Sequence, residues 1–165
     1  MRQRINRLLY LLSLLALVSC GGTLFHRYEQ VGDMLWEKSD TIEFLYNGSE
    51  LGSETGVDAT LEIRHDAGYD NRYLLVRMEV MDVVDNCIVA VDTFLCEVYD
   101  DYGRRNGSAS GGLYQLSGNT LPLPISSKDT VLVRLSHIME QETLDGIADV
   151  GIKFVESSVH GQHQF

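Results

Sequence analysis

The most constraining feature of this sequence is a strict alternation of apolar and polar residues over Val57–Arg64. Successive side chains of a β-strand point to opposite faces of a sheet, so the pattern predicts a half-buried strand. Turn-forming residues separate this segment from others of the same kind, and no helices alternate with them, which predicts one antiparallel β-sandwich. The further predicted strands are Ile42–Tyr46, Leu74–Met81, Thr93–Tyr99, Thr130–Leu135 and Val150–Val155.

The expected topology is jelly-roll-like with about eight strands, and an immunoglobulin-like Greek key is the alternative. Only His137–Asp145 has a composition that suits a turn or two of helix. The glycine- and serine-rich segment Arg104–Gly118 has few residues to bury and is predicted to form a mobile surface loop. We expect the sandwich to occupy residues 41–156, followed by a polar tail at 157–165.

Residues 1–19 have the composition of a cleaved lipoprotein signal peptide. Three arginines precede an apolar run of about eleven residues, Leu8–Val18, which is too short to span a bilayer as a helix. Residues 17–20 (Leu-Val-Ser-Cys) then resemble a bacterial lipobox, in which the cysteine thiol is lipidated and the chain is cut before it. The sequence therefore predicts a lipid on Cys20, with residues 20–40 as the lipidated N-terminus and a tether.

The charge of the chain excludes one large class of function. There are 13 basic and 24 acidic residues, a formal net charge of −11, and loss of the three signal-peptide arginines would make it −14. Nucleic-acid binding needs a basic face for the phosphates, so we expect no nucleic-acid partner. Charge will not draw the domain to anionic headgroups either, so the lipid must hold it at the membrane.

Sequence motifs of catalysis are not found. The chain has no Gly-x-Ser-x-Gly elbow, no His-Glu-x-x-His and no phosphate-binding glycine loop that opens a helix. We therefore expect no enzyme, no cofactor and no metal. The acidic pairs Asp66/Asp70 and Asp100/Asp101 are interpreted as turn carboxylates rather than calcium ligands.

Cys87 and Cys96 remain besides Cys20. As one extended strand, the segment between them would separate the sulfurs by about 30 Å, whereas a disulfide needs Cα atoms within about 7 Å. Pairing would require a reversal near residues 90–92. We favour two separate thiols, with Cys96 buried.

A series of aromatic, arginine and glycine residues follows Cys20 along the chain. Its members are Tyr28, Trp36, Phe44, Ile63-Arg64-His65, Tyr69, Asn71, Asp92-Thr93, Gly103, Met139 and the segment Leu144–Ile152. Together they resemble the gliding-motility lipoprotein H (GldH) family of Bacteroidota, over nearly all of the chain after the cysteine. The resemblance implies an envelope lipoprotein associated with the gliding and type IX secretion machinery, with no known catalytic role.

The favoured function is a non-enzymatic, membrane-anchored lipoprotein that binds other envelope, motility or secretion proteins and has no small-molecule substrate. Glycine rather than aspartate follows Cys20, which by the enterobacterial sorting rule points to the outer membrane. The lack of acidic residues just after the cysteine favours the periplasmic face over the cell surface. Candidate residues of an interaction surface are Trp36, Arg64, Tyr69, Tyr102, Arg104 and Arg105, and the alternative for Trp36 is a cap on the sandwich core.

A surface glycan-binding lipoprotein is the alternative function, since jelly rolls often bind sugars on a concave face. It predicts an exposed aromatic platform. The candidate rings are Tyr69, Tyr73, Tyr99, Tyr102 and Tyr114.

Overall fold

Strands with alternating buried and exposed side chains dominate the computed structural model, which describes residues 22–49 and 55–157. In β9 (Thr130–His137), for example, Val131, Val133 and Leu135 are buried and the residues between them are partly exposed. One short 3-10 turn, η1 (Gly32–Met34), is the only helical element in these residues. The other strands are β1 (Thr23–Gln30), β2 (Leu35–Glu37), β3 (Ile42–Asn47), β4 (Gly56–His65), β5 (Tyr73–Asp82), β6 (Cys87–Glu97), β7 (Ser108–Ser110), β8 (Leu113–Ser126), β10 (Thr143–Asp145) and β11 (Ile147–Glu156).

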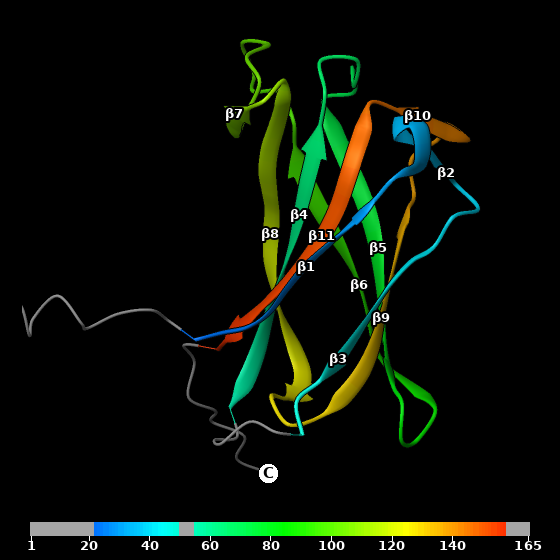
Figure 1. Ribbon diagram of the computed structural model, residues 1–165, viewed down its shortest axis with the longest axis vertical. Coiled ribbons are helices and arrows are strands. Elements are labelled where there is room, and N and C mark those ends of the chain that lie inside the picture. Colours follow the sequence, from blue (N-terminus) through cyan, green and yellow to red (C-terminus); the bar gives the residue numbers. More distant parts are fainter. Residues whose placement is uncertain (1–21, 50–54, 158–165) are drawn as a thin grey trace, which may run out of the picture.

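Two antiparallel sheets enclose the hydrophobic core. One has the strand order β1-β11-β4-β8-β7 and the other has the order β3-β9-β5-β6, while β2 and β10 pair in a small separate ribbon. Figure 1 shows β1, β11 and β4 in front of β5 and β6, with the β2–β10 ribbon at the upper end. Both sheets supply core side chains, among them Phe44, Phe94 and Phe154. The predicted β-sandwich is confirmed.

The strand pairing identifies the sandwich as a jelly roll. Within the sheets, β1 pairs with β11, β3 with β9, β4 with β8 and β5 with β6. The chain thus follows the path of one long hairpin wound around the core, which is the arrangement of a double-sheet jelly roll. An immunoglobulin-like Greek key keeps its first two strands in one sheet. Here β3 and β4 lie in different sheets, so the expected jelly-roll topology is correct and the Greek-key alternative is not.

The six strands that the sequence predicts are all present, but the prediction of a tether before them is wrong for residues 23–30. That segment is strand β1, in register with β11 from Thr23 to Gln30. The ring of Phe25 lies 5.7 Å from those of Tyr46 and Phe154, so β1 covers one edge of the core. The signal peptide and Cys20 lie outside the described residues.

Two further local predictions are wrong. The segment Arg104–Gly118 is not one long loop, because it contains β7 and the first residues of β8, joined by a two-residue turn. The segment His137–Asp145 forms no helix, since β9 ends and β10 begins within it. Most of the predicted tail, residues 158–165, lies outside the described residues, and the part of the chain that the structure describes contains no helix long and apolar enough to span a membrane.

Candidate interaction surface

Tyrosine and arginine side chains gather at the end of the sandwich where β4 and β6 finish and β5 and β8 begin, at the top of Figure 1. In each stacked pair the guanidinium carbon lies 4.9–5.3 Å from the centre of a tyrosine ring, which is the range of cation–π contacts. We call this group the tyrosine–arginine end. Its members are Arg72, Tyr73, Tyr99, Tyr102, Arg104, Arg105 and Tyr114.

Arg105 ties three segments of this end together. Its guanidinium lies over the rings of both Tyr99 and Tyr114. Its Nε donates a hydrogen bond to the Tyr99 hydroxyl at 3.1 Å, and Nη2 donates to the carbonyl of Ala67 at 2.9 Å. The Tyr99 hydroxyl in turn donates to the carbonyl of Tyr69 at 2.8 Å. These contacts give Arg105 a structural role in closing the end of the core.

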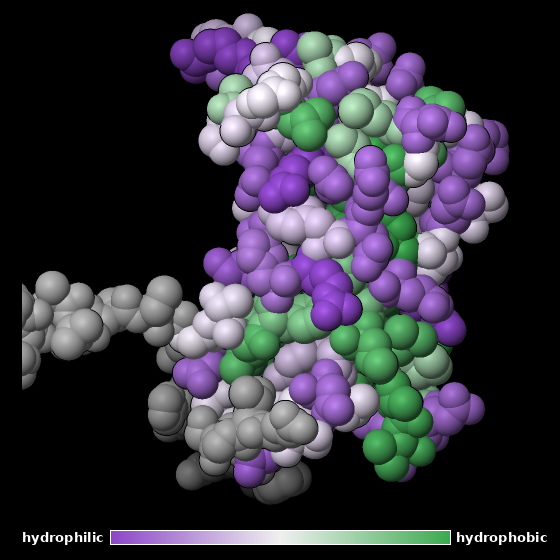
Figure 2. All heavy atoms as spheres, in the orientation of Figure 1, coloured by the Kyte–Doolittle hydropathy of each residue, from purple (hydrophilic) through white to green (hydrophobic). Residues whose placement is uncertain are grey.

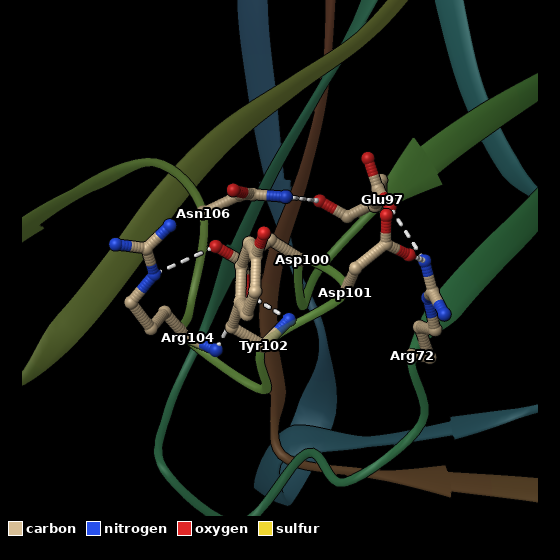
Figure 3. A network of polar contacts seen from close by, with 7 residues as sticks. All are labelled: Arg72, Glu97, Asp100, Asp101, Tyr102, Arg104 and Asn106. Carbon is tan, nitrogen blue, oxygen red and sulfur yellow. Dashed lines mark hydrogen bonds and ion pairs between the residues drawn. The ribbon is translucent and has the colours of Figure 1, made fainter.

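The loop after β6 is held in one shape by Asp100, as Figure 3 shows. One carboxylate oxygen accepts the backbone N–H groups of Tyr102 and Arg104, both at 2.9 Å, and the other accepts Nε of Arg104 at 2.8 Å. The backbone N–H of Arg104, together with that residue's side chain, lowers the pKa of the Asp100 carboxyl. The side-chain amide of Asn106 also donates to the carbonyl of Glu97 at 2.9 Å.

Arg72 links this loop to the start of β5. Its Nη2 donates to a carboxylate oxygen of Asp101 and to Glu97 at 3.2 Å. The carboxylates of Asp100 and Asp101 are thus engaged by turn and arginine groups, in agreement with their interpretation as turn residues. The side chain of Tyr102 is left 84% exposed at the tip of an ordered loop.

Two of the predicted surface residues are core residues instead. Trp36 is 1% exposed, packs edge-on against the ring of His137 and donates from Nε1 to the carbonyl of Asp40 at 3.3 Å. Tyr69 is also 1% exposed, and its hydroxyl donates to the carbonyl of Tyr73 at 2.9 Å. The prediction of surface roles for Trp36 and Tyr69 is therefore wrong, whereas the cap alternative for Trp36 agrees with its burial.

Arg64 belongs to a different group, on the outer face of the five-stranded sheet. Its guanidinium carbon lies 4.0 Å from the centre of the Tyr28 ring. The Tyr28 hydroxyl donates to Glu62, whose carboxylate is also 2.8 Å from Nε2 of His26. Glu62 is only 7% exposed, because these side chains cover it. We call His26, Tyr28, Glu62 and Arg64 the Glu62 cluster.

The Glu62 cluster requires a glycine beneath it. Tyr28 reaches Glu62 by crossing over Gly151 of β11, where an added Cβ would lie 2.5 Å from a Tyr28 ring carbon. Burial, followed by the contact with Glu62, raises the pKa of the Tyr28 hydroxyl, which therefore stays protonated and donates. Tyr28, Arg64 and Gly151 all belong to the series that resembles the GldH family. Glu62 and His26 were missed, because their contacts come from a segment predicted to be a tether.

Cys87 and Cys96 are both free thiols. Cys87 is exposed, Cys96 is buried, and neither forms a disulfide, as predicted. Burial raises the pKa of the Cys96 thiol to about 12, so that thiol is protonated and inert at neutral pH. Within residues 22–49 and 55–157, no three histidine, cysteine, aspartate or glutamate side chains are arranged to hold a metal ion.

Two hollows border these groups on the protein surface. One of about 600 Å³ lies between β6 and β8 and is lined mainly by uncharged polar and apolar residues, including Leu95, Asn106 and Asn119. The other, of about 240 Å³, lies beside Arg64 and the β7–β8 hairpin.

Fold and surface together define an acidic jelly-roll protein that carries an ordered, exposed tyrosine–arginine end. The family model described as GldH lipoprotein matches residues 23–154, and the chain belongs to this family. It is accordingly a lipoprotein of the cell envelope, associated with gliding motility.

Other comparisons are distant. No curated protein matches the chain. The VP2 subviral particle of infectious bursal disease virus is similar at 12% identity and a TM-score of 0.33, with 83% of this chain and 34% of the viral chain covered. The Gt strain of the same virus gives 10% identity, a TM-score of 0.32, and coverage of 87% and 36%. The chain thus spans about a third of these viral proteins, and such low TM-scores support no conclusion about fold or function.

Proposed function

We propose that this protein is a non-enzymatic component of the gliding-motility and type IX secretion machinery that binds other envelope proteins through its tyrosine–arginine end. Its anchor is a lipid on Cys20, placed in the outer membrane on the periplasmic face. The observation that carries the proposal is the exposure of Tyr102 and Arg104 on a loop that Asp100 already holds in shape. Tyrosine and arginine are enriched among residues that dominate binding energy at interfaces, and a preordered loop loses less entropy on binding.

The arrangement of the rings favours protein binding over glycan binding. Tyr69, one of the five candidate platform rings, is buried. A guanidinium lies over each of the other four rings, so one face of each ring is already occupied. A sugar platform needs open ring faces, whereas an arginine stacked on a tyrosine presents donors and apolar area together, which suits a protein partner.

Site-specific photo-cross-linking from the exposed tip tests the proposed partner surface. A photoreactive residue replaces Tyr102 in the full-length lipidated protein, in cells of the source bacterium. The matched control places it at Arg77, which is also exposed but lies on the outer face of the four-stranded sheet, within β5 rather than at its end. We expect position 102, and not position 77, to capture a motility or secretion protein. Equal capture from both positions, or adducts with abundant porins alone, would contradict the proposal.

Replacing Tyr102 and Arg104 together by alanine gives a second test. We expect most of the captured partner to be lost while the melting temperature stays unchanged, since both side chains are exposed. Arg77→Ala is the control and should retain the partner. Arg105 is unsuitable for this test, because its contacts close the core and its loss would also lower stability.

The anchor and its orientation are tested separately. Metabolic labelling with a palmitate analogue should mark the wild-type protein and not Cys20→Ser, and only the wild type should remain with membranes. Protease added to intact cells should leave the wild-type protein uncut until the outer membrane is opened. Digestion in intact cells would place the domain on the cell surface and overturn the periplasmic assignment.

A further inference from the structure

The end of the sandwich opposite the tyrosine–arginine end carries an exposed apolar surface. On the outer face of the four-stranded sheet, strand register aligns one apolar residue from each strand in a row: Leu45 beside Leu132, Leu132 beside Met81, and Met81 beside Ile88. The adjoining β5–β6 hairpin adds Val83 and Val84. We call Leu45, Met81, Val83, Val84, Ile88 and Leu132 the apolar end, and Figure 2 shows hydrophobic side chains gathered there, at the lower right.

The apolar end has a charged border on three of its four strands. On β3, β9 and β5 the next row of the same sheet face is charged: Arg134 bonds Glu43 at 2.8 Å, and Glu79 bonds Arg77, one row further on, at 2.7 Å. On β6 the same row is apolar, because it holds Val91, which is 52% exposed. On β3, β9 and β5 a charged row therefore borders the apolar end, whereas on β6 apolar exposure continues to Val91 and Leu95. An exposed apolar surface with charged residues at its border is typical of a site that binds a membrane or another molecule.

The hairpin presents its valines in a fixed way. A carboxylate oxygen of Asp82 accepts the backbone N–H groups of Val84 and Asp85, at 2.7 and 2.9 Å. Val84 is 83% exposed as a result, and Val83 is 45% exposed. Burying a side chain of this size is favourable by about 1.5 kcal/mol or more. The exposure is costly unless something covers it.

The N-terminal strand brings the anchor to this surface. The ring of Phe25 in β1 lies 5.7 Å from Tyr46 and 6.5 Å from Phe44 in β3, the two neighbours of Leu45. Cys20 precedes Phe25 by five residues, which span at most about 17 Å. Leu45 lies between these two core residues, with its side chain on the outer face of the sheet, so a bilayer that holds the acyl chains of Cys20 can also reach this end of β3.

We propose that the apolar end rests on the bilayer that holds the Cys20 lipid, so that the domain lies directly on the membrane. The proposal rests on the proposed lipidation of Cys20. The occupant is an uncharged or zwitterionic phospholipid surface, because the apolar end offers no cationic cluster and the chain is strongly acidic. Contact is shallow, since Asp85 follows the valines in the hairpin and Glu43, Arg134 and Glu79 lie in the row next to Leu132. The tyrosine–arginine end then points away from the membrane, toward partners.

Tryptophan fluorescence in vesicles tests this contact. Val84→Trp and, as a matched control, Tyr102→Trp are made in the full-length lipidated protein and reconstituted into phosphatidylethanolamine and phosphatidylcholine vesicles that contain brominated lipid. Trp36 is buried, so it supplies a constant background. We expect the fluorescence emission of the tryptophan at position 84 to shift to shorter wavelength and to be largely quenched by the brominated lipid. Added salt should change neither effect. The tryptophan at position 102 should show neither change.

Flotation of the same vesicles separates the two proposals. If the protein does not float with vesicles, the lipid anchor fails. If it floats but position 84 is no more quenched than position 102, the anchor stands and the membrane contact is overturned. A concentration-dependent dimer of the Cys20→Ser protein that Val84→Asp abolishes would assign the apolar end to a second copy and likewise overturn the inference.

Discussion

Gly151 shows how one missing side chain shapes the outer face of the five-stranded sheet. We predict that Gly151→Ala destabilises the protein by about 2 kcal/mol, because the new methyl group would meet the Tyr28 ring. In a Tyr28→Ala background the same change should cost clearly less, which a double-mutant cycle by urea unfolding measures. Gly32→Ala is the control, since nothing lies within 4 Å of its added Cβ. If Gly151→Ala lowered the free energy of unfolding equally in the wild-type and Tyr28→Ala proteins, the contact with the Tyr28 ring would be refuted.

His137 makes stability depend on pH. Burial lowers the pKa of this residue, which is 1% exposed beside Trp36, and burial lowers that of His65 as well. The folded state keeps both rings neutral, whereas the unfolded chain binds protons below about pH 6.5. Above about pH 6.5 the two histidines therefore do not lower the free energy of unfolding. As the pH falls from there toward their pKa values in the folded state, the unfolded chain takes up protons and the folded state loses stability.

The expected result is a lower free energy of unfolding at pH 5.5 than at pH 7.5, measured by urea titration. His137→Phe keeps an aromatic ring against Trp36 but removes one titrating group, so its pH dependence should be weaker. The His65 contribution remains in that variant. If the free energy of unfolding of His137→Phe depended on pH as steeply as that of the wild type, His137 would not be a source of the pH dependence.

At the scale of single elements, the β7–β8 hairpin depends on two glycines. Gly111 and Gly112 both have positive φ, +61° and +87°, as the central residues of a type I′ turn do. Gly112→Ala should cost about 1 kcal/mol or more, because an L side chain is strained in that conformation. Gly111→Asn should be tolerated, since asparagine adopts it readily. Thermal unfolding and hydrogen exchange of Ser108–Leu113 measure the difference.

The hairpin also shows where sequence-based prediction fails. Glycine and serine composition indicated a long loop, yet the two adjacent glycines form a tight turn between paired strands. β8 was missed for a related reason, since Pro122 and Pro124 argue against a central strand. They are tolerated because this part of β8 pairs with β4 on one side only. The six predicted strands were found because each buries several alternating side chains.

The interaction surface was predictable only in part. Tyr102 and Arg104 lie in a segment of turn composition, and such segments are exposed in most proteins. Trp36 and Tyr69 could not be placed, because their burial depends on His137 and on loops distant in sequence. The arginine–tyrosine stacking, with Arg105 between two rings from different strands, likewise follows from tertiary packing and has no local signal.

At the scale of the whole molecule, β11 should be indispensable. It lies between β1 and β4, and Val150, Ile152 and Phe154 are fully buried. Each such side chain contributes about 2 kcal/mol on burial. Loss of the strand therefore removes a stabilisation comparable to the whole free energy of unfolding of a marginally stable domain. A chain ending at Gly146 should show no cooperative thermal transition, whereas one ending at Ser157 should melt like the wild type. Cooperative melting of the shorter chain would contradict the pairing described here.

The pairing of β1 with β11 also has a consequence for the order of assembly. A ribosome makes the first strand long before its partner, and β3 and β4 likewise wait for β9 and β8. Among the described strands, β5 with β6 and the short β7 with β8 are made in immediate succession with their partners. The N-terminal half of the chain must therefore remain unfinished, with open strand edges, until synthesis is nearly complete. Folding that is delayed until the end of synthesis is thus a direct result of pairing the first strand with the last.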